Sequence, residues 1–191
     1  SDRYQYVLPY YNFSLNSIPT NNGSINFSSS GNNTLDNTNN AKSRVINDVS
    51  YTFNEKIFGN VGLSNNLSFY FKNLNSVGKN VAQYKSSPQV EIQSLLELNS
   101  ELPLSKKTVL NNQTLVPRLS LRFNPGDMKN HSDTERKINI NNIFDINRLG
   151  LEDSFESGNS LTLGIDYKKE NIEDKDRSLE IKLASVFRDS E

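Results

Sequence analysis

The sequence has no cysteine and no tryptophan, and it has only one histidine and one methionine among 191 residues. The lack of cysteine excludes a disulfide framework and a cysteine nucleophile, and with a single histidine it also excludes a Cys/His zinc site. The 21 Lys and Arg residues nearly balance the 22 Asp and Glu residues, and they form no basic run. Nucleic acid is therefore not expected as a partner, because binding it requires a positively charged footprint.

Long apolar runs are also missing. No stretch approaches the roughly 18 uninterrupted apolar residues that a transmembrane helix needs. A transmembrane β-barrel is not excluded, since its strands alternate apolar with polar residues. The chain is rich in asparagine (29) and serine (25), a bias typical of turns, loops or disorder. Disorder of the whole chain is not expected, because its apolar residues follow a regular order.

That order has a period of two. Leu119, Leu121 and Phe123 would share one face of a strand, while Ser120 and Arg122 would lie on the other. The pattern predicts an all-β fold, an antiparallel meander of about eight strands near residues 4–15, 24–29, 45–57, 61–73, 86–100, 113–124, 159–170 and 178–188. Segment 86–100 alternates less cleanly, and a helical turn is the alternative there.

The expected connections alternate in length. In order they are short (17–23), long (30–43), short (58–60), long (74–85), medium (101–112), very long (124–158) and short (171–177). Such alternation is typical of an outer-membrane barrel, with tight turns on the periplasmic side and extended loops outside. Both ends of the chain would then lie on the outer side, whereas a complete barrel is expected to begin and end in the periplasm. We therefore expect residues 1–191 to be one internal piece of a large transmembrane β-barrel.

The segment 124–158 lacks alternation and mixes apolar with charged residues. Long insertions without regular structure are usually functional or disordered. Here, charge-assisted hydrogen bonds could hold a folded-over loop, and we expect a loop that packs on itself or into the barrel lumen.

Several short motifs in this region resemble one known family. The sequence reads Leu-Val-Pro-Arg-Leu over 115–119, Asn-Ile-Phe-Asp-Ile-Asn-Arg over 142–148, Glu-Ser-Gly-Asn over 156–159 and Ser-Leu-Thr-Leu-Gly-Ile-Asp-Tyr over 160–167. A Pro-Arg at the start of a strand, a loop with an aromatic-Asp-x-Asn-Arg core, a downstream acidic residue and a Leu/Thr/Gly strand are similar to the LPS-assembly protein (LptD) family. The resemblance extends over 113–188 and rests on Pro117, Arg118, Asn142, Phe144, Asp145, Asn147, Arg148, Asp153, Glu156, Gly158 and Gly164.

The resemblance implies a bacterial outer-membrane translocon. With a plug lipoprotein of the LptE type, such a barrel receives lipopolysaccharide from a periplasmic bridge and releases it sideways into the outer leaflet. This is non-enzymatic transport without a cofactor. The bridge would be contacted through a periplasmic domain that has no counterpart in these residues. The alternation places the polar side chains Arg118, Arg122, Asp166, Glu180 and Lys182 toward the lumen, where water stabilises their charges.

Two charged segments could indicate other functions, namely catalysis or calcium binding. His131 lies among Asp127, Asp133 and Glu135, as in a catalytic site, but a lone histidine in a charged run is more often a solvated loop residue, so no catalytic residue is expected. The carboxylates Glu170, Glu173, Asp174 and Asp176 lack the ordered ligand series of a calcium loop, so no metal site is expected either. The alternative function is a small self-contained outer-membrane barrel, or a secreted β-sandwich that acts as an adhesin or binding module. Because the expected sheet has two open edges, we expect the isolated chain to aggregate in water.

Overall fold

The computed structural model describes residues 5–36, 39–127, 138–174 and 176–189. They form one antiparallel sheet, which confirms the all-β meander. Its strands are β1 (Gln5–Thr20), β2 (Gly23–Asp36), β3 (Asn40–Phe53), β4 (Lys56–Phe58), β5 (Leu63–Lys79), β6 (Gln89–Glu101), β7 (Leu104–Lys107), β8 (Asn111–Asn124), β9 (Gly158–Asn171) and β10 (Ser178–Arg188). The order is β1-β2-β3-β5-β6-β8-β9-β10, with β4 beside β5 and β7 beside β8, and the sheet is not closed into a barrel.

The structure corrects the expected connections. The prediction of a long loop over 30–43 is wrong. β2 continues to Asp36 and β3 begins at Asn40, so the connection between them is short. The asparagines and serines of this segment form a regular ladder, in which Ser43 pairs with Asn33 and its hydroxyl donates to the Asn33 side chain. The alternation of short and long connections therefore fails here. The two strands beyond the eight expected, β4 and β7, are short and lie within connections. Segment 86–100 forms a strand, β6, and the helical alternative is wrong.

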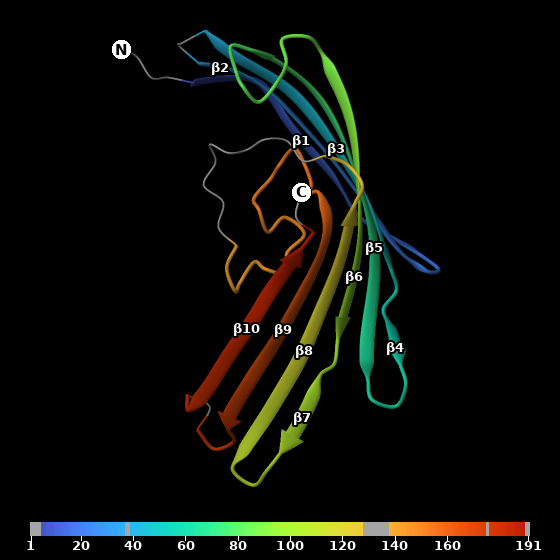
Figure 1. Ribbon diagram of the computed structural model, residues 1–191, viewed down its shortest axis with the longest axis vertical. Coiled ribbons are helices and arrows are strands. Elements are labelled where there is room, and N and C mark those ends of the chain that lie inside the picture. The colour runs from blue at the N-terminus through green and yellow to red at the C-terminus, as the bar shows by residue number, and fades with distance from the viewer. Residues whose placement is uncertain (1–4, 37–38, 128–137, 175, 190–191) are drawn as a thin grey trace.

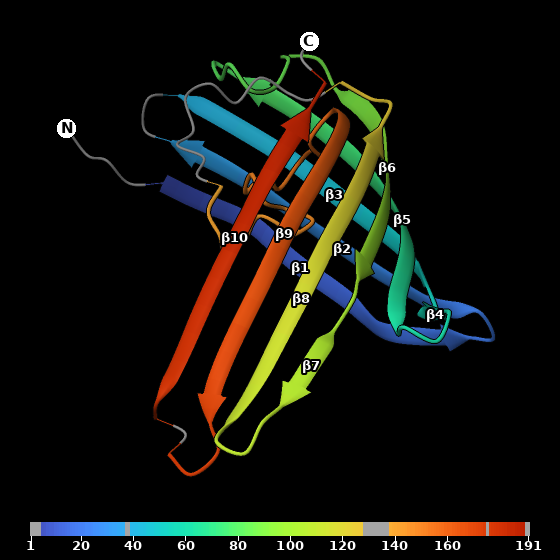
Figure 2. The same ribbon diagram turned by 60° about the horizontal axis from the view of Figure 1, so that its bottom comes forward.

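The sheet is a curved wall with two different ends (Figures 1 and 2). The connections after β2, β5 and β8 lie at one end, here called the loop end, and the others lie at the turn end. The described part of the connection between β8 and β9, residues 138–157, folds back onto the concave face of the wall (Figure 1). We call these residues the inner loop.

Burial is inverted relative to a water-soluble sheet. On β8, Ser120 and Arg122 are buried, whereas Leu121 and Phe123 are 43% and 48% exposed. The buried residues lie under the inner loop on what we call the polar face, and the exposed ones form the opposite, apolar face. A small apolar cluster of Ile46, Leu74 and Tyr84 lies on the polar face near the loop end. Among the described residues, no helix is long and apolar enough to cross a membrane.

Candidate functional site on the polar face

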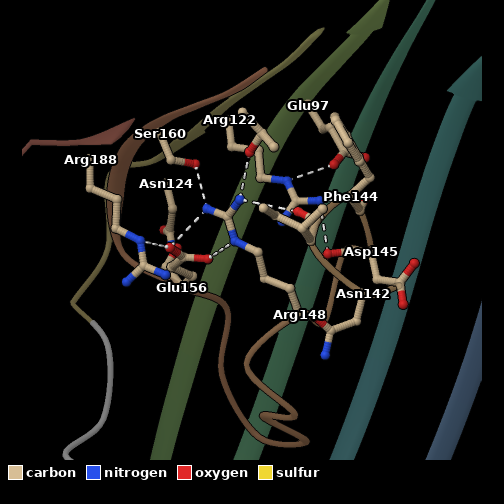
Figure 3. Close-up of polar contacts among 12 residues, drawn as sticks. Glu97, Arg122, Asn124, Asn142, Phe144, Asp145, Arg148, Glu156, Ser160 and Arg188 are labelled. Carbon is tan, nitrogen blue, oxygen red and sulfur yellow. Dashed lines mark hydrogen bonds and ion pairs between the residues drawn. The ribbon is translucent and has the colours of Figure 1, made fainter. Parts of the chain in front are cut away.

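Arg148 is the centre of the contact between the inner loop and the sheet (Figure 3). Its guanidinium is fully buried and donates from Nε and Nη2 to the two carboxylate oxygens of Glu156, at 2.6 and 2.9 Å. It also donates to the hydroxyls of Thr162 (2.7 Å) and Ser160 (2.9 Å) on β9. A planar guanidinium is suited to such fixed, multiple contacts. Arg148 thus fastens the loop both to itself and to the sheet.

Arg122 on β8 also binds the inner loop, in this case from the sheet. Its Nε lies 2.7 Å from a carboxylate oxygen of Glu97 on β6, and both side chains are nearly fully buried. Its Nη2 donates to the backbone carbonyls of Phe144 (2.9 Å) and Asp145 (2.8 Å). A buried ion pair of this kind is costly to break, because removing one partner leaves an uncompensated charge.

Phe144 is held between two of the residues that carry the family resemblance. The guanidinium carbon of Arg118 lies 4.5 Å from the centre of the Phe144 ring, a cation–π contact. On the paired strand, a Cβ at Gly164 would lie 2.7 Å from the same ring. Only glycine leaves room for the ring at this distance. Pro117 precedes Arg118 and lies on the apolar face, so it takes no part in this contact.

A third group of contacts holds the part of the inner loop nearest to β5. Lys72 on β5 lies 2.7 Å from Asp48 on β3 and donates to the backbone carbonyl of Glu152 at 2.9 Å. The Glu152 carboxylate pairs with Arg44. The backbone N–H of Phe155 donates to Gln93 on β6 at 2.8 Å. Sheet residues from β3, β5 and β6 therefore all bind the loop.

Asp153 ties the inner loop to the connection between β5 and β6. Its Oδ2 accepts hydrogen bonds from Tyr84 and Gln83, each at 2.9 Å. Burial, together with the Asp153 charge, raises the pKa of the Tyr84 hydroxyl well above its usual value. Tyr84 is therefore a neutral hydrogen-bond donor over the physiological range.

At the end of β9 nearest the loop, Gly158 and Glu156 meet the end of β10. Gly158 has a φ of +77°, and a Cβ there would lie 2.7 Å from the Asp189 carboxylate. Asp189 accepts hydrogen bonds from the Asn159 backbone N–H (2.8 Å) and side chain (2.6 Å), which lower the pKa of its carboxyl. Arg188 donates to Glu156 at 2.6 Å, so Glu156 is shared by two arginines.

The remaining residues of the family motif have smaller roles. The side-chain oxygen of Asn142 accepts the backbone N–H of Asn139 at 2.8 Å, which closes a turn of the loop. Asp145 and Asn147 are exposed, and Asp145 contributes its backbone carbonyl rather than its carboxylate. Of the charged residues of this segment, Arg148 pairs with Glu156, and among the described residues the Asp145 carboxylate forms no ion pair.

The polar residues expected to face a lumen lie on the polar face by register. Lys182 pairs with Asp166 across β9 and β10, and Asp166 lies 3.6 Å from Arg118. Glu180 forms an exposed ion pair with Lys182 at 2.9 Å. The inner loop does not cover this part of the polar face, whereas it does cover the part around Arg122.

A groove of about 800 Å³ lies beside the inner loop, over β1, β2 and β3. Short polar side chains line its floor, namely Asn12, Ser14, Asn26, Ser28, Ser30, Asn32 and Ser50. Arg44, Lys72 and Tyr70 lie along the side toward the loop. Apolar residues, among them Ile46, Leu151 and Phe155, line the groove as well, so its surface mixes hydrogen-bonding groups with apolar ones.

Sequence reasoning missed the residues of the sheet that receive the loop. Glu97, Lys72 and Gln93 are all buried, yet no motif contains them. Their only signal is position, since each stands on the polar side of an alternating strand. Tyr84 lies in a connection and had no signal of this kind.

The residues considered for catalysis and for calcium binding lie in two charged segments, 127–135 and 170–176. Three of the four residues named for catalysis, His131, Asp133 and Glu135, lie outside the described residues. The carboxylates at 170–176 form a turn, in which Asn171 accepts the N–H groups of Glu173 and Asp174 and Arg177 pairs with Asp174. In the described part of the chain, no group of His, Cys, Asp and Glu has the arrangement of a metal site.

No family model matches the sequence, and no curated protein matches it either.

Proposed function

We propose that this chain is part of the wall of a large outer-membrane β-barrel that inserts lipopolysaccharide into the outer leaflet. The barrel is a non-enzymatic transporter. Its lumen takes the sugar part of the lipid, while the acyl chains reach the bilayer through an opening in the wall. As in the family that the sequence resembles, the partners are an LptE-like plug lipoprotein and the periplasmic bridge.

The observation that carries the proposal is the inverted burial of the sheet. Many large apolar side chains are exposed on the apolar face, including Phe71 (51%), Leu183 (64%) and Phe187 (56%). Full burial of a side chain of this kind is worth about 1.5–3 kcal/mol, so leaving it half exposed to water costs roughly half of that. Hydrocarbon on one face and water on the other removes that cost and satisfies both faces.

The exposed apolar side chains of this face form a band that we call the apolar belt. The belt crosses the strands obliquely, at an angle close to the strand tilt of a transmembrane barrel. On β2 the belt spans Phe27 to Ile25, and on β9 it spans Leu161 to Tyr167. The hydrogen-bonded row of Ile25 leads through Tyr51, Phe69, Leu96 and Phe123 to Asn159.

The two edges of the belt can be followed from this row. On β2 the belt edge nearer the turn end is Ile25, and on β9 it is Tyr167, which lies eight residues beyond Asn159, the residue in the same row as Ile25. From β2 to β9 this edge therefore shifts toward the turn end by about 27 Å over five strand spacings, which are about 24 Å wide. The edge nearer the loop end, from Phe27 on β2 to Leu161 on β9, shifts toward the turn end by four residues, about 14 Å, over the same width. The belt is thus inclined by about 30° to 50° to the rows, which brackets the strand tilt of roughly 35–45° in outer-membrane barrels.

The open sheet supports a piece of a larger barrel over the alternative functions. A sandwich would need a second sheet over the apolar face, and the described residues form a single sheet. A small self-contained barrel would need β1 to pair with β10, and no such pairing is present among the described strands. The groove beside the inner loop, with its row of asparagine and serine side chains, lies along the concave face.

Photo-crosslinking in cells tests the proposal. A photoreactive amino acid at Ser28 in the groove is expected to capture lipopolysaccharide. The matched control is Asn65, on the apolar side near the turn end, where lipopolysaccharide is not expected. Absence of an adduct at Ser28, in protein that has reached the outer membrane, would overturn the transport role.

A further inference from the structure

The wall divides near the turn end. β5 and β6 remain paired as far as Ser64 and Glu101, and the chain of β6 then continues into β7. β7 pairs with β8, and no described strand pairs with its other edge. Figure 2 shows the β4–β5 hairpin and β7 running apart from this point. We call the divided region, bounded by Leu63, Glu101 and Leu102, the notch.

Two hollows meet at the notch. On the apolar face, a hollow of about 790 Å³ is lined by Leu63, Leu102, Pro117, Leu119, Leu163 and Leu183, among others. On the polar face, a hollow of about 320 Å³ is lined by Glu55, Asn66, Asn99, Glu101, Arg118 and Phe144, among others. Ser100, Glu101, Arg118 and Leu119 border both hollows. An apolar and a polar pocket thus lie back to back on either side of the wall.

We propose that the notch binds one zwitterionic phospholipid of the phosphoethanolamine type. This inference rests on the proposed membrane location of the sheet. One acyl chain lies in the apolar hollow, which is continuous with the apolar belt. The headgroup passes the divided edge of the wall and lies in the polar hollow.

The charges of the polar hollow select this headgroup. The hollow has two carboxylates, Glu55 and Glu101, and one guanidinium, that of Arg118. Arg118 lies 3.6 Å from both Glu101 and Asp166, so it is loosely paired, and its side chain is 37% exposed. A phosphate can therefore approach Arg118, while an ammonium group meets the carboxylates. A purely anionic headgroup would face an excess of negative charge.

A photoreactive phospholipid tests the site. The protein in bilayers is exposed to phosphatidylethanolamine or phosphatidylglycerol that carries a diazirine in its acyl chain, and the adducts are mapped by mass spectrometry. We expect adducts of the ethanolamine lipid to concentrate on Leu102, Leu119 and Leu163 relative to Leu179, which is equally apolar but lies outside both hollows. The glycerol lipid is expected to show no such enrichment.

Two pairs of variants complete the test. Leu102→Trp fills the apolar hollow and should abolish the enrichment at Leu119, whereas Leu179→Trp should leave it unchanged. Glu101→Gln should reduce the preference for ethanolamine over glycerol lipid by about tenfold, as expected when a charge-assisted contact is lost. Glu173→Gln, in an exposed turn, should have no effect on the preference.

The outcomes separate this inference from the proposed function. Adducts spread evenly along the apolar face would mean ordinary surrounding lipid and would overturn the notch site, while the membrane location stands. Enrichment that is the same for both lipids would overturn the headgroup assignment. Absence of adducts on the entire apolar face would overturn both proposals.

Discussion

Replacement of Arg148 by methionine should release the inner loop from the sheet. The substitution keeps an unbranched side chain but removes the charge and the hydrogen bonds to Glu156, Thr162 and Ser160. Loss of one partner from a buried ion pair costs about 3–5 kcal/mol. We take the lower value, about 3 kcal/mol, because Glu156 keeps its contact with Arg188. Since 1.4 kcal/mol is a factor of ten, opening of the loop should become about 100-fold more frequent.

Hydrogen exchange of the lipid-embedded protein measures this opening. The Phe155 amide, which donates to Gln93, should exchange about 100-fold faster in Arg148→Met, whereas amides paired between β2 and β3 should not change. Arg177→Met, which removes an exposed ion pair with Asp174, is the matched control and should change exchange by less than about threefold. If the Phe155 amide responds no more to Arg148→Met than to the control, Arg148 does not fasten the loop.

Three further predictions concern single contacts of the loop and of the loop end. Gly164→Ala should displace Phe144 and destabilise the loop by about 1–3 kcal/mol, detected as faster proteolysis of the loop; unchanged proteolysis would contradict the close contact. Tyr84→Phe should weaken the contact with Asp153 by about 1–3 kcal/mol, as measured by exchange of the 80–88 amides, and a neutral effect would show that the hydroxyl is dispensable. Because the pKa of Asp189 is lowered in the folded protein, its contribution to stability is present above its usual pKa and should disappear as the pH falls through the lowered value. The Asn159 amide should therefore lose protection in acid in the natural sequence, and Asp189→Asn should remove that pH dependence.

The sequence predicts the strands well where both faces have a clear character. In β9, Leu161, Leu163 and Ile165 alternate with Thr162 and Gly164, and the strand forms as expected. The prediction failed over 30–43, because asparagine and serine favour turns locally but pair well across two neighbouring strands. Strand pairing outweighs local preference there.

Of the polar contacts that hold the inner loop, the sequence indicated only those between residues of the loop itself, and not those between the loop and the rest of the sheet. The pairing of Arg148 with Glu156 joins residues eight positions apart, so interleaved charges could indicate it. The contacts of Lys72 with Glu152 and of Tyr84 with Asp153 join residues 80 and 69 positions apart. Nothing local in the sequence specifies such pairs, because they depend on how the sheet curves beneath the loop.

Cysteine labelling at two neighbouring positions of β10 tests the central claim most directly. The chain has no cysteine of its own, so Lys182→Cys and Leu183→Cys each introduce a single reactive group. Both residues are exposed on the sheet, but on opposite faces. In the membrane, a charged, water-borne maleimide should modify Cys at 182 and leave Cys at 183 unmodified, although both residues are exposed on the sheet. Equal modification of the two positions would show that water reaches both faces, and would contradict the membrane assignment.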